Sequence, residues 1–218
     1  AYDYPMARIL DEAGVDILHV GDSLGMLVLG QEDTTQVTMA DMEHHVRAVA
    51  RGRSRALITA DLPIASYDDP KSAVENCRRL IEAGADAIKL EGGHEIAPQI
   101  KAAIAAGIPV QGHLGMLPQR IREEGGYKRK GKTPRERDAM IRDAQLLADL
   151  GCFSIVLECV VHEVAAAVTA ACPVPTLGIA AGEGCDGEIR VVHDVIGMFP
   201  WFVPPFAKPL EHVAARIR

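Results

Sequence analysis

Short apolar runs alternate with amphipathic segments along almost the whole chain. The apolar runs are rich in valine, isoleucine, leucine and alanine, as strands of a buried parallel sheet are. We expect strands at residues 15–21, 55–61, 85–91, 108–113, 153–158, 174–179 and 189–194. The amphipathic segments predict helices at residues 5–13, 39–51, 70–83, 95–106, 134–150, 161–171 and 205–218. Several of these begin at a proline or an acidic residue and end near a glycine, as helix termini prefer.

A short sequence motif recurs at three places in the chain. The segments that start at positions 12, 82 and 149 read "EAGVDILHVGD", "EAGADAIKLEG" and "DLGCFSIVLEC". Each has a glycine after an amphipathic segment, where a helix C-cap stands, and then an apolar strand that ends in an acidic residue. The terminal acids are Asp22, Glu91 and Glu158. This repetition favours repeated strand–helix units whose strands all end at the same edge of one sheet.

Seven expected strands alternate with helices, and residues 1–2 read as the end of an eighth. We therefore predict an α/β protein with a (β/α)8 TIM barrel, in a single domain over residues 1–218. A doubly wound open sheet is the alternative. Because Ala1 opens in the middle of the pattern, we expect a preceding N-terminal segment that this sequence lacks.

Composition narrows the functional classes. The 218 residues are 48% hydrophobic but only 4% aromatic, a balance typical of helices packed on a parallel sheet. A net charge of −7 disfavours nucleic acid as a partner. The five cysteines have no CxxC spacing, so they are interpreted as buried thiols in a reducing compartment. With no signal peptide and no expected membrane span, we predict a cytoplasmic protein.

Polar side chains gather where the apolar strands end. They are Asp22, Ser23, Asp61, Lys89, Glu91, His113 and Glu158. In a barrel the carboxyl ends of the strands carry the active groups. Lys89 and Glu91 stand two positions apart on one strand, so their side chains share a face. Each residue alone fits a cap, a turn or an ion pair, but together they favour a site.

The residue types indicate the chemistry of this site. Asp22, Asp61 and Glu91 supply carboxylates without a cysteine or histidine cluster, which suits Mg²⁺ better than zinc. The Lys89 ammonium beside such a cation would hold an anionic substrate such as a carboxylate. Glu158 follows "SIVL", an apolar setting that disfavours its charged form and suits a general base.

The motifs resemble one family in order and spacing. They are "AYDYPMA", "HVGDSLGM", "ADLP", "IKLEGG", "GHLG", "GGYK", "LECV", "GIAAG" with "CDG", "HDVIG" and "FAK", between residue 1 and about residue 208. The family is ketopantoate hydroxymethyltransferase, within the phosphoenolpyruvate mutase and isocitrate lyase superfamily. The resemblance implies a Mg²⁺-dependent barrel enzyme of pantothenate biosynthesis. It implies transfer of a hydroxymethyl group from 5,10-methylenetetrahydrofolate to 3-methyl-2-oxobutanoate, through a Mg²⁺-stabilised enolate, to give 2-dehydropantoate.

The same resemblance implies roles for individual residues. The metal ligands would be Asp22, Asp61 and, through water, Glu91. The substrate-binding residues would be Tyr2, Asp22, Ser23, Asp61, Lys89 and His113. Glu158 would be the catalytic proton acceptor. The family also implies a ring-based homo-oligomer, with a decamer as the candidate size.

Several positions depart from the family's usual motifs. Leu117 replaces a threonine, Arg120 a small residue, Val161 a proline and Ala180 a glycine. These departures leave open a lyase or mutase that uses the same Mg²⁺ site on another 2-keto acid, and a non-catalytic keto-acid-binding barrel. The basic run "YKRKGK" at residues 127–132 is either a folate-tail contact or a solvated loop.

Overall fold

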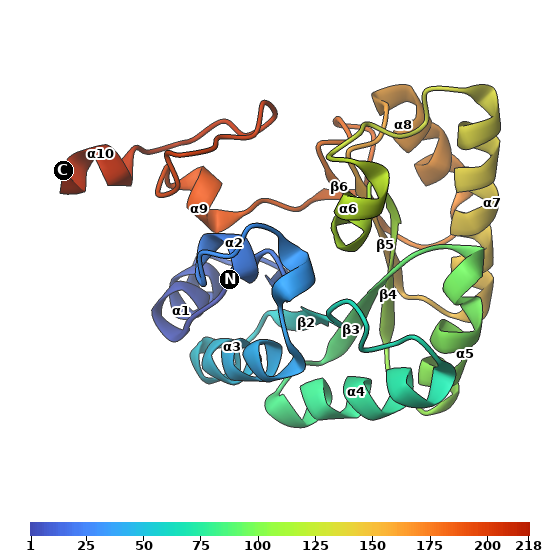
Figure 1. Ribbon diagram of the computed structural model, residues 1–218, viewed down its shortest axis with the longest axis horizontal. Coiled ribbons are helices and arrows are strands. Elements are labelled where there is room, and N and C mark those ends of the chain that lie inside the picture. Colours follow the sequence, from blue (N-terminus) through green and yellow to red (C-terminus); the bar gives the residue numbers. More distant parts are fainter.

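The computed structural model describes residues 1–218 and has one curled parallel sheet. Its seven strands are β1 (Ile17–Val20), β2 (Leu57–Asp61), β3 (Ala87–Glu91), β4 (Val110–Gly115), β5 (Ser154–Glu158), β6 (Thr176–Ile179) and β7 (Gly187–Glu188). Neighbours in space are neighbours in sequence, and every pair is parallel. The sheet bends into a partial barrel with helices on its outer side (Figure 1).

Helices connect the strands. They are α1 (Tyr4–Glu12), α2 (Leu24–Leu27), α3 (Met39–Gly52), α4 (Pro70–Ala83), α5 (Ala97–Ala105), α6 (Ile121–Glu124), α7 (Pro134–Leu150), α8 (His162–Ala171), α9 (Val192–Val195) and α10 (Val213–Ile217), with 3-10 turns η1 (Thr34–Gln36), η2 (His94–Ile96) and η3 (Pro118–Arg120). The ends of α4 and α7 have residues that commonly cap helices. Asp69 caps α4 before Pro70, and the left-handed glycines Gly84 and Gly151 end α4 and α7.

The predicted class is confirmed, but the predicted closure is not. Consecutive strand order rules out the doubly wound alternative, which needs a reversal of order within the sheet. The sheet has seven strands and is not closed as an eight-stranded barrel. Residues 1–2 were expected to end an eighth strand, but they precede α1 outside the sheet.

Two expected elements near the C-terminus are wrong. The strand expected at 189–194 is replaced by the shorter β7, which pairs with β6 through Gly178 and Glu188, and by α9. The helix expected at 205–218 is reduced to α10. Pro209 lies inside the expected helix and lacks a backbone N–H donor, so a continuous helix through it is disfavoured.

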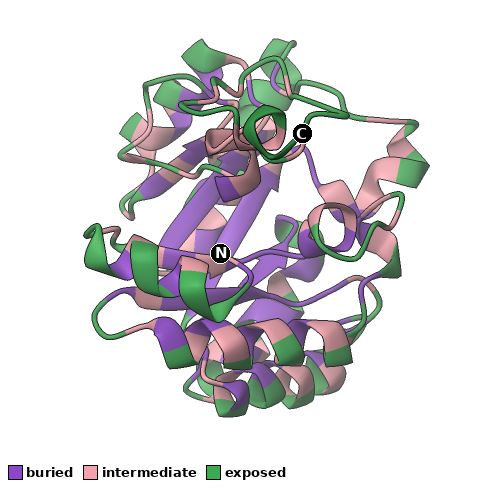
Figure 2. Ribbon diagram, turned by 90° about the vertical axis from the view of Figure 1, so that its left-hand side faces the viewer, coloured by how far each residue is buried: buried purple, intermediate pink, exposed green.

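The core lies between the strands and the inner faces of the helices (Figure 2). A cluster of 39 buried residues joins these layers. At the end of the sheet away from the strand-end acids, the Asp11 carboxylate accepts hydrogen bonds from the backbone N–H groups of Ser54, Arg55 and Ala56, which ties α1 to the start of β2. None of the helices combines the length and the apolar character needed to cross a bilayer.

One departure from the family's usual sequence carries a conformational cost. Ala180, where that pattern has glycine, follows β6 with φ of 54°, in the left-handed region that disfavours a Cβ. We expect Ala180→Gly to raise the free energy of unfolding by about 0.5–1 kcal/mol, because relief of the strain exceeds the entropy that glycine adds to the unfolded chain. Urea unfolding measures this, with Ala181→Gly as a control that lowers stability. An Ala180→Gly variant no more stable than wild type would contradict the strain.

Candidate active site

The parallel register brings the strand-end side chains together. Asp61 on β2 stands beside Lys89 on β3, and Glu91 on β3 stands beside His113 on β4. On the next pair, Gly115 of β4 faces Glu158 of β5. The side chains expected from the sequence therefore lie along one edge of the sheet, at the carboxyl ends of adjacent strands. This arrangement is the usual location of an active site in such folds.

Lys89 is the centre of this edge. Its side chain is only 5% exposed, and Nζ lies 2.9 Å from Asp61 Oδ1 and 3.7 Å from Glu91 Oε1. The shorter distance shows that Asp61, rather than Glu91, is its nearest carboxylate. Burial lowers the pKa of the Lys89 ammonium, but the surrounding carboxylates outweigh burial and raise that pKa above its ordinary value. Lys89 is therefore a permanent buried cation.

Asp22 and Asp61 form the acidic side of the site. The backbone N–H of Asp22, directly after β1, donates to Asp61 Oδ2 at 3.0 Å. Burial, followed by the charges of Asp61 and Glu91, raises the pKa of Asp22 well above its ordinary value. Burial also works against ionisation of Asp61, but Lys89 and His19 outweigh it and hold the pKa of Asp61 below its ordinary value.

This donor set fits a hard divalent cation. Three buried carboxyl groups surround one ammonium, and the charges of Asp61 and Glu91 disfavour ionisation of Asp22, a repulsion that a bound cation would relieve. The ion pair with Lys89 leaves Asp61 Oδ1 without an aligned hydrogen bond. No group of three aspartate, glutamate, histidine or cysteine side chains is arranged so that it could hold a metal ion by itself. A Mg²⁺ ion held by few carboxylates and completed by water and substrate needs no such group.

His113 connects Lys89 to Glu158. Lys89 Nζ lies 3.1 Å from His113 Nδ1; because an ammonium can only donate, Nδ1 accepts in this contact, and a neutral ring then carries its proton on Nε2. His113 Nε2 lies 3.3 Å from Glu158 Oε2, although the two are not aligned as a hydrogen bond. The Glu158 side chain is 20% exposed, whereas those of Lys89, Asp61 and His113 are nearly inaccessible. Glu158 thus presents a carboxylate to the open side of the site.

Tyr2 and Ser23 form a second polar pair beside Asp22. The Tyr2 hydroxyl and Ser23 Oγ are 2.8 Å apart, with Tyr2 preceding α1 and Ser23 preceding α2. Burial raises the pKa of Tyr2, so its phenol stays neutral. Both residues therefore supply neutral hydrogen-bonding groups next to the buried charges.

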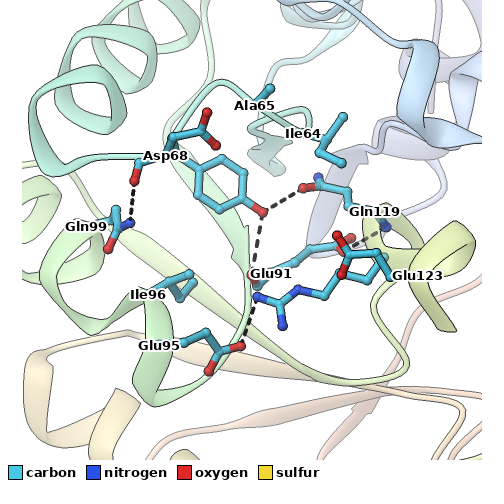
Figure 3. A pocket seen from close by; sticks show the side chains of 11 residues that line it. Ile64, Ala65, Asp68, Glu91, Glu95, Ile96, Gln99, Gln119 and Glu123 are labelled. Carbon is cyan, nitrogen blue, oxygen red and sulfur yellow. Dashed lines mark hydrogen bonds and ion pairs between the residues drawn. The ribbon is translucent and has the colours of Figure 1, made fainter.

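Three further residues of the site were not predicted from the sequence. His19, within β1, lies 3.4 Å from Asp61 through Nε2 and 2.7 Å from Thr59 Oγ1 through Nδ1. A lone polar residue inside an apolar strand was the signal for it. Gln119 and Tyr67 lie in loops and had no comparable signal. Both line a cavity of about 330 Å³ between the loops after β2, β3 and β4 (Figure 3).

The chain matches known proteins along its full length. The sequence profile described as ketopantoate hydroxymethyltransferase matches residues 1–218. The 3-methyl-2-oxobutanoate hydroxymethyltransferase of Syntrophobacter fumaroxidans is 52% identical over all of this chain and 78% of its own length. The enzyme of the same name from Pyrobaculum neutrophilum is 53% identical over all of this chain and 84% of its own.

Solved structures share the fold at low sequence identity. Oxaloacetate acetylhydrolase in complex with oxalate has a TM-score of 0.66 at 20% identity, over 87% of this chain and 72% of that one. Phosphonopyruvate hydrolase in complex with oxalate and Mg²⁺ has a TM-score of 0.63 at 16% identity, over 82% and 65%. The 2,3-dimethylmalate lyase, a PEP mutase/isocitrate lyase superfamily member, has a TM-score of 0.59 at 20% identity, over 81% and 62%. The full-length match at about half identity, on a sheet whose edge carries the expected side chains, places this chain in the ketopantoate hydroxymethyltransferase family of enzymes.

Proposed function

We propose that this protein transfers a hydroxymethyl group from 5,10-methylenetetrahydrofolate to 3-methyl-2-oxobutanoate and so forms 2-dehydropantoate, a step of pantothenate biosynthesis. Full-length relatives at about half identity carry the name of this activity. The observation that carries the proposal is the row of buried Lys89, His113 and partly exposed Glu158 beside the three carboxylates. Along one edge of the sheet, Lys89 can bind the substrate anion, the carboxylates can bind a cation, and Glu158 can accept a proton.

The keto-acid is held by charge and by neutral donors. Lys89 attracts its carboxylate, and after its contacts to Asp61 and His113 one of its three N–H groups remains. Ser23 Oγ and the Tyr2 hydroxyl, at the other side of Asp22, hydrogen-bond the polar end of the substrate. Binding in this orientation leaves the C3 side directed toward β5 and Glu158.

The residues that would hold Mg²⁺ are Asp22 and Asp61, with Glu91 acting through water. Their oxygen donors, and the repulsion among the three carboxyl groups that a cation would relieve, support a hard cation. When bound, Mg²⁺ supplies Lewis-acid polarisation of the ketone, which is worth several kcal/mol in such sites. Burial of these carboxylates keeps bulk water from competing for the same charge.

Glu158 performs the proton transfer. The C3 hydrogen beside the ketone is weakly acidic, and a placed base accelerates its removal by about 10²- to 10⁴-fold. The proton goes to Glu158. Both C–N bonds of the folate methylene bridge break as that carbon becomes bonded to C3 and to a water oxygen, which becomes the hydroxyl group. The proton taken from C3 and one proton of the water end on the two folate nitrogens, and tetrahydrofolate leaves. His113 Nε2 lies 3.3 Å from Glu158 Oε2, so the imidazole stands directly beside the proposed base.

One assay tests the proposal. Purified protein with Mg²⁺, 3-methyl-2-oxobutanoate and 5,10-methylenetetrahydrofolate is expected to form 2-dehydropantoate, followed by mass spectrometry, and to stop when folate is omitted. Folate-independent cleavage of a 2-keto acid would replace the proposal with the lyase or mutase alternative. Binding of the keto-acid without turnover under all these conditions would favour a non-catalytic barrel.

The basic loop at residues 127–132 is proposed to attract the anionic glutamate tail of the folate. Lys130 pairs with Val160 of the segment after β5, through backbone hydrogen bonds to Cys159 and Val161, so the loop lies next to the Glu158 strand end. The Lys130 side chain also pairs with Glu124, whereas Lys128, Arg129 and Lys132 are exposed. The exposed cations are therefore the candidates for the folate tail.

Replacing Lys128, Arg129 and Lys132 by serine, with Lys130 kept, is expected to raise the folate KM several-fold at low salt. The difference from wild type should shrink as salt rises, because screening weakens attraction between exposed charges. Steady-state kinetics at two ionic strengths measure this, and Lys71→Ser, on exposed α4, is the control. An unchanged folate KM would indicate a solvated loop that does not contact the folate tail.

The proposal also includes a cytoplasmic homo-oligomer, with a ring-based decamer as the candidate form. The segment after α9 exposes the large apolar side chains of Trp201, Phe202 and Phe206. Such a surface is available to another copy of the chain. The partners proposed are the small 2-keto acid and the folate.

A further inference from the structure

Gln119 contacts three strand ends at once. It lies in η3 after β4, and its residue is only 4% exposed. Its amide Nε2 donates to Asp22 Oδ2 at 2.9 Å and to the carbonyl of Leu62 at 2.8 Å. Its backbone N–H donates to Glu91 Oε2 at 3.2 Å. One residue from the fourth loop therefore connects the ends of β1, β2 and β3.

Tyr67 fixes the orientation of this amide. Its hydroxyl donates to Gln119 Oε1 at 2.6 Å, from the loop between β2 and α4. Because the Leu62 carbonyl can only accept, the NH₂ group must face Leu62 and Asp22, and the amide oxygen must face Tyr67. A flipped amide would place its oxygen against the Leu62 carbonyl. All hydrogen-bonding atoms of the Gln119 side chain are thereby used in one orientation.

These contacts leave one oxygen of each carboxylate without a contact to Gln119. Gln119 occupies Asp22 Oδ2 and Glu91 Oε2, so Asp22 Oδ1 and Glu91 Oε1 remain for other partners. Glu91 Oε1 already faces Lys89 and His113, toward the interior of the site. Without such contacts, two buried carboxylates of like charge would repel and rotate apart.

We infer that Gln119, held by Tyr67, is a positioning residue that aims the other oxygens of Asp22 and Glu91 at one divalent cation, directly for Asp22 and through water for Glu91. This inference rests on the metal site of the proposed function. Groups that orient metal ligands typically change metal affinity by about 10- to 100-fold when removed. The role is indirect, because Gln119 itself places no donor atom on the cation.

The test measures metal binding alone, without substrate or turnover. Mn²⁺, a spectroscopic substitute for Mg²⁺, is titrated into the protein and followed by electron paramagnetic resonance and calorimetry. We expect Gln119→Met, which keeps the length of the side chain but removes its donors, to weaken Mn²⁺ binding ~10-fold or more and to alter the spectrum of bound Mn²⁺. Tyr67→Phe, which keeps the packing and removes only the hydroxyl, is expected to weaken it several-fold.

Gln99→Met is the matched control. Gln99 lines the same cavity, and its amide donates only to the Asp68 carbonyl, so its loss should leave Mn²⁺ affinity unchanged. Wild-type affinity in both Gln119→Met and Tyr67→Phe would overturn the inference while leaving the metal site in place. Should Gln119→Met fail to fold, Tyr67→Phe decides alone. A wild-type protein that binds no Mn²⁺ would overturn both the metal assignment and this inference.

Discussion

Glu158→Gln is expected to bind Mg²⁺ and 3-methyl-2-oxobutanoate with nearly normal affinity yet to lose proton transfer. Glutamine keeps the shape of the side chain but cannot accept the C3 proton. Wild-type protein with Mg²⁺ and no folate should exchange the C3 hydrogen for deuterium from solvent, because proton removal precedes transfer. In the variant, exchange and hydroxymethyl transfer should fall together by ~10²-fold or more.

Nuclear magnetic resonance of the substrate in deuterium oxide measures the exchange, and product formation measures the transfer. Glu163→Gln, an exposed glutamate at the start of α8, is the control that should retain both rates. If Glu158→Gln exchanged at the wild-type rate, the base would lie elsewhere. His113, whose Nε2 lies 3.3 Å from Glu158, would then be the next candidate.

Asp61→Asn is expected to weaken Mg²⁺ binding by ~100-fold or more and to abolish measurable turnover. Loss of groups that only support a metal ligand costs up to about 100-fold, and Asp61 is proposed as a direct ligand. Asparagine keeps the size of the side chain but removes the charge that Lys89 and the cation share. Because Lys89 stays buried with one carboxylate fewer beside it, we also expect a lower melting temperature.

Calorimetric titration with Mg²⁺ and thermal unfolding of the metal-free protein separate these effects. Asp11→Asn is the matched control, since Asp11 is equally buried and accepts backbone hydrogen bonds at the opposite end of β2. It should lower the melting temperature while Mg²⁺ affinity stays at the wild-type value. Normal Mg²⁺ affinity in Asp61→Asn would remove Asp61 from the ligand set.

The strand ends were predictable because an apolar run that follows a glycine and ends in an acidic residue is a strong local pattern. β2, β3 and β5 end at Asp61, Glu91 and Glu158, at the positions that the sequence indicated. Parallel strands place their carboxyl ends at one edge, so the clustering of these side chains followed from the fold class. A separate Lys89–Glu91 pair was also foreseeable, but Asp61 proved to be the nearer partner of Lys89.

Predictions from weak local patterns failed where tertiary contacts determine the structure. The apolar residues at 189–194 have the alternation of a strand, yet β7 pairs with β6 only at Gly187 and Glu188, and Val192–Val195 form α9. Gln119 could not be recognised from its neighbours, because an amide in a loop has no periodicity. Its importance comes from partners that are distant in sequence, such as Asp22, 97 residues away.

The sequence by itself determined the α/β class, the alternation of strands and helices, and the residue types at the strand ends. These features depend on short-range periodicity and on caps formed within a few residues. Only the tertiary structure decided the extent of sheet closure, the Lys89–Asp61 pairing and the contacts of Gln119 to Asp22 and Glu91. The physical reason is that hydrogen-bond and charge partners are chosen by distance in space, which depends on register and loop path across several strands rather than on any local run of residues.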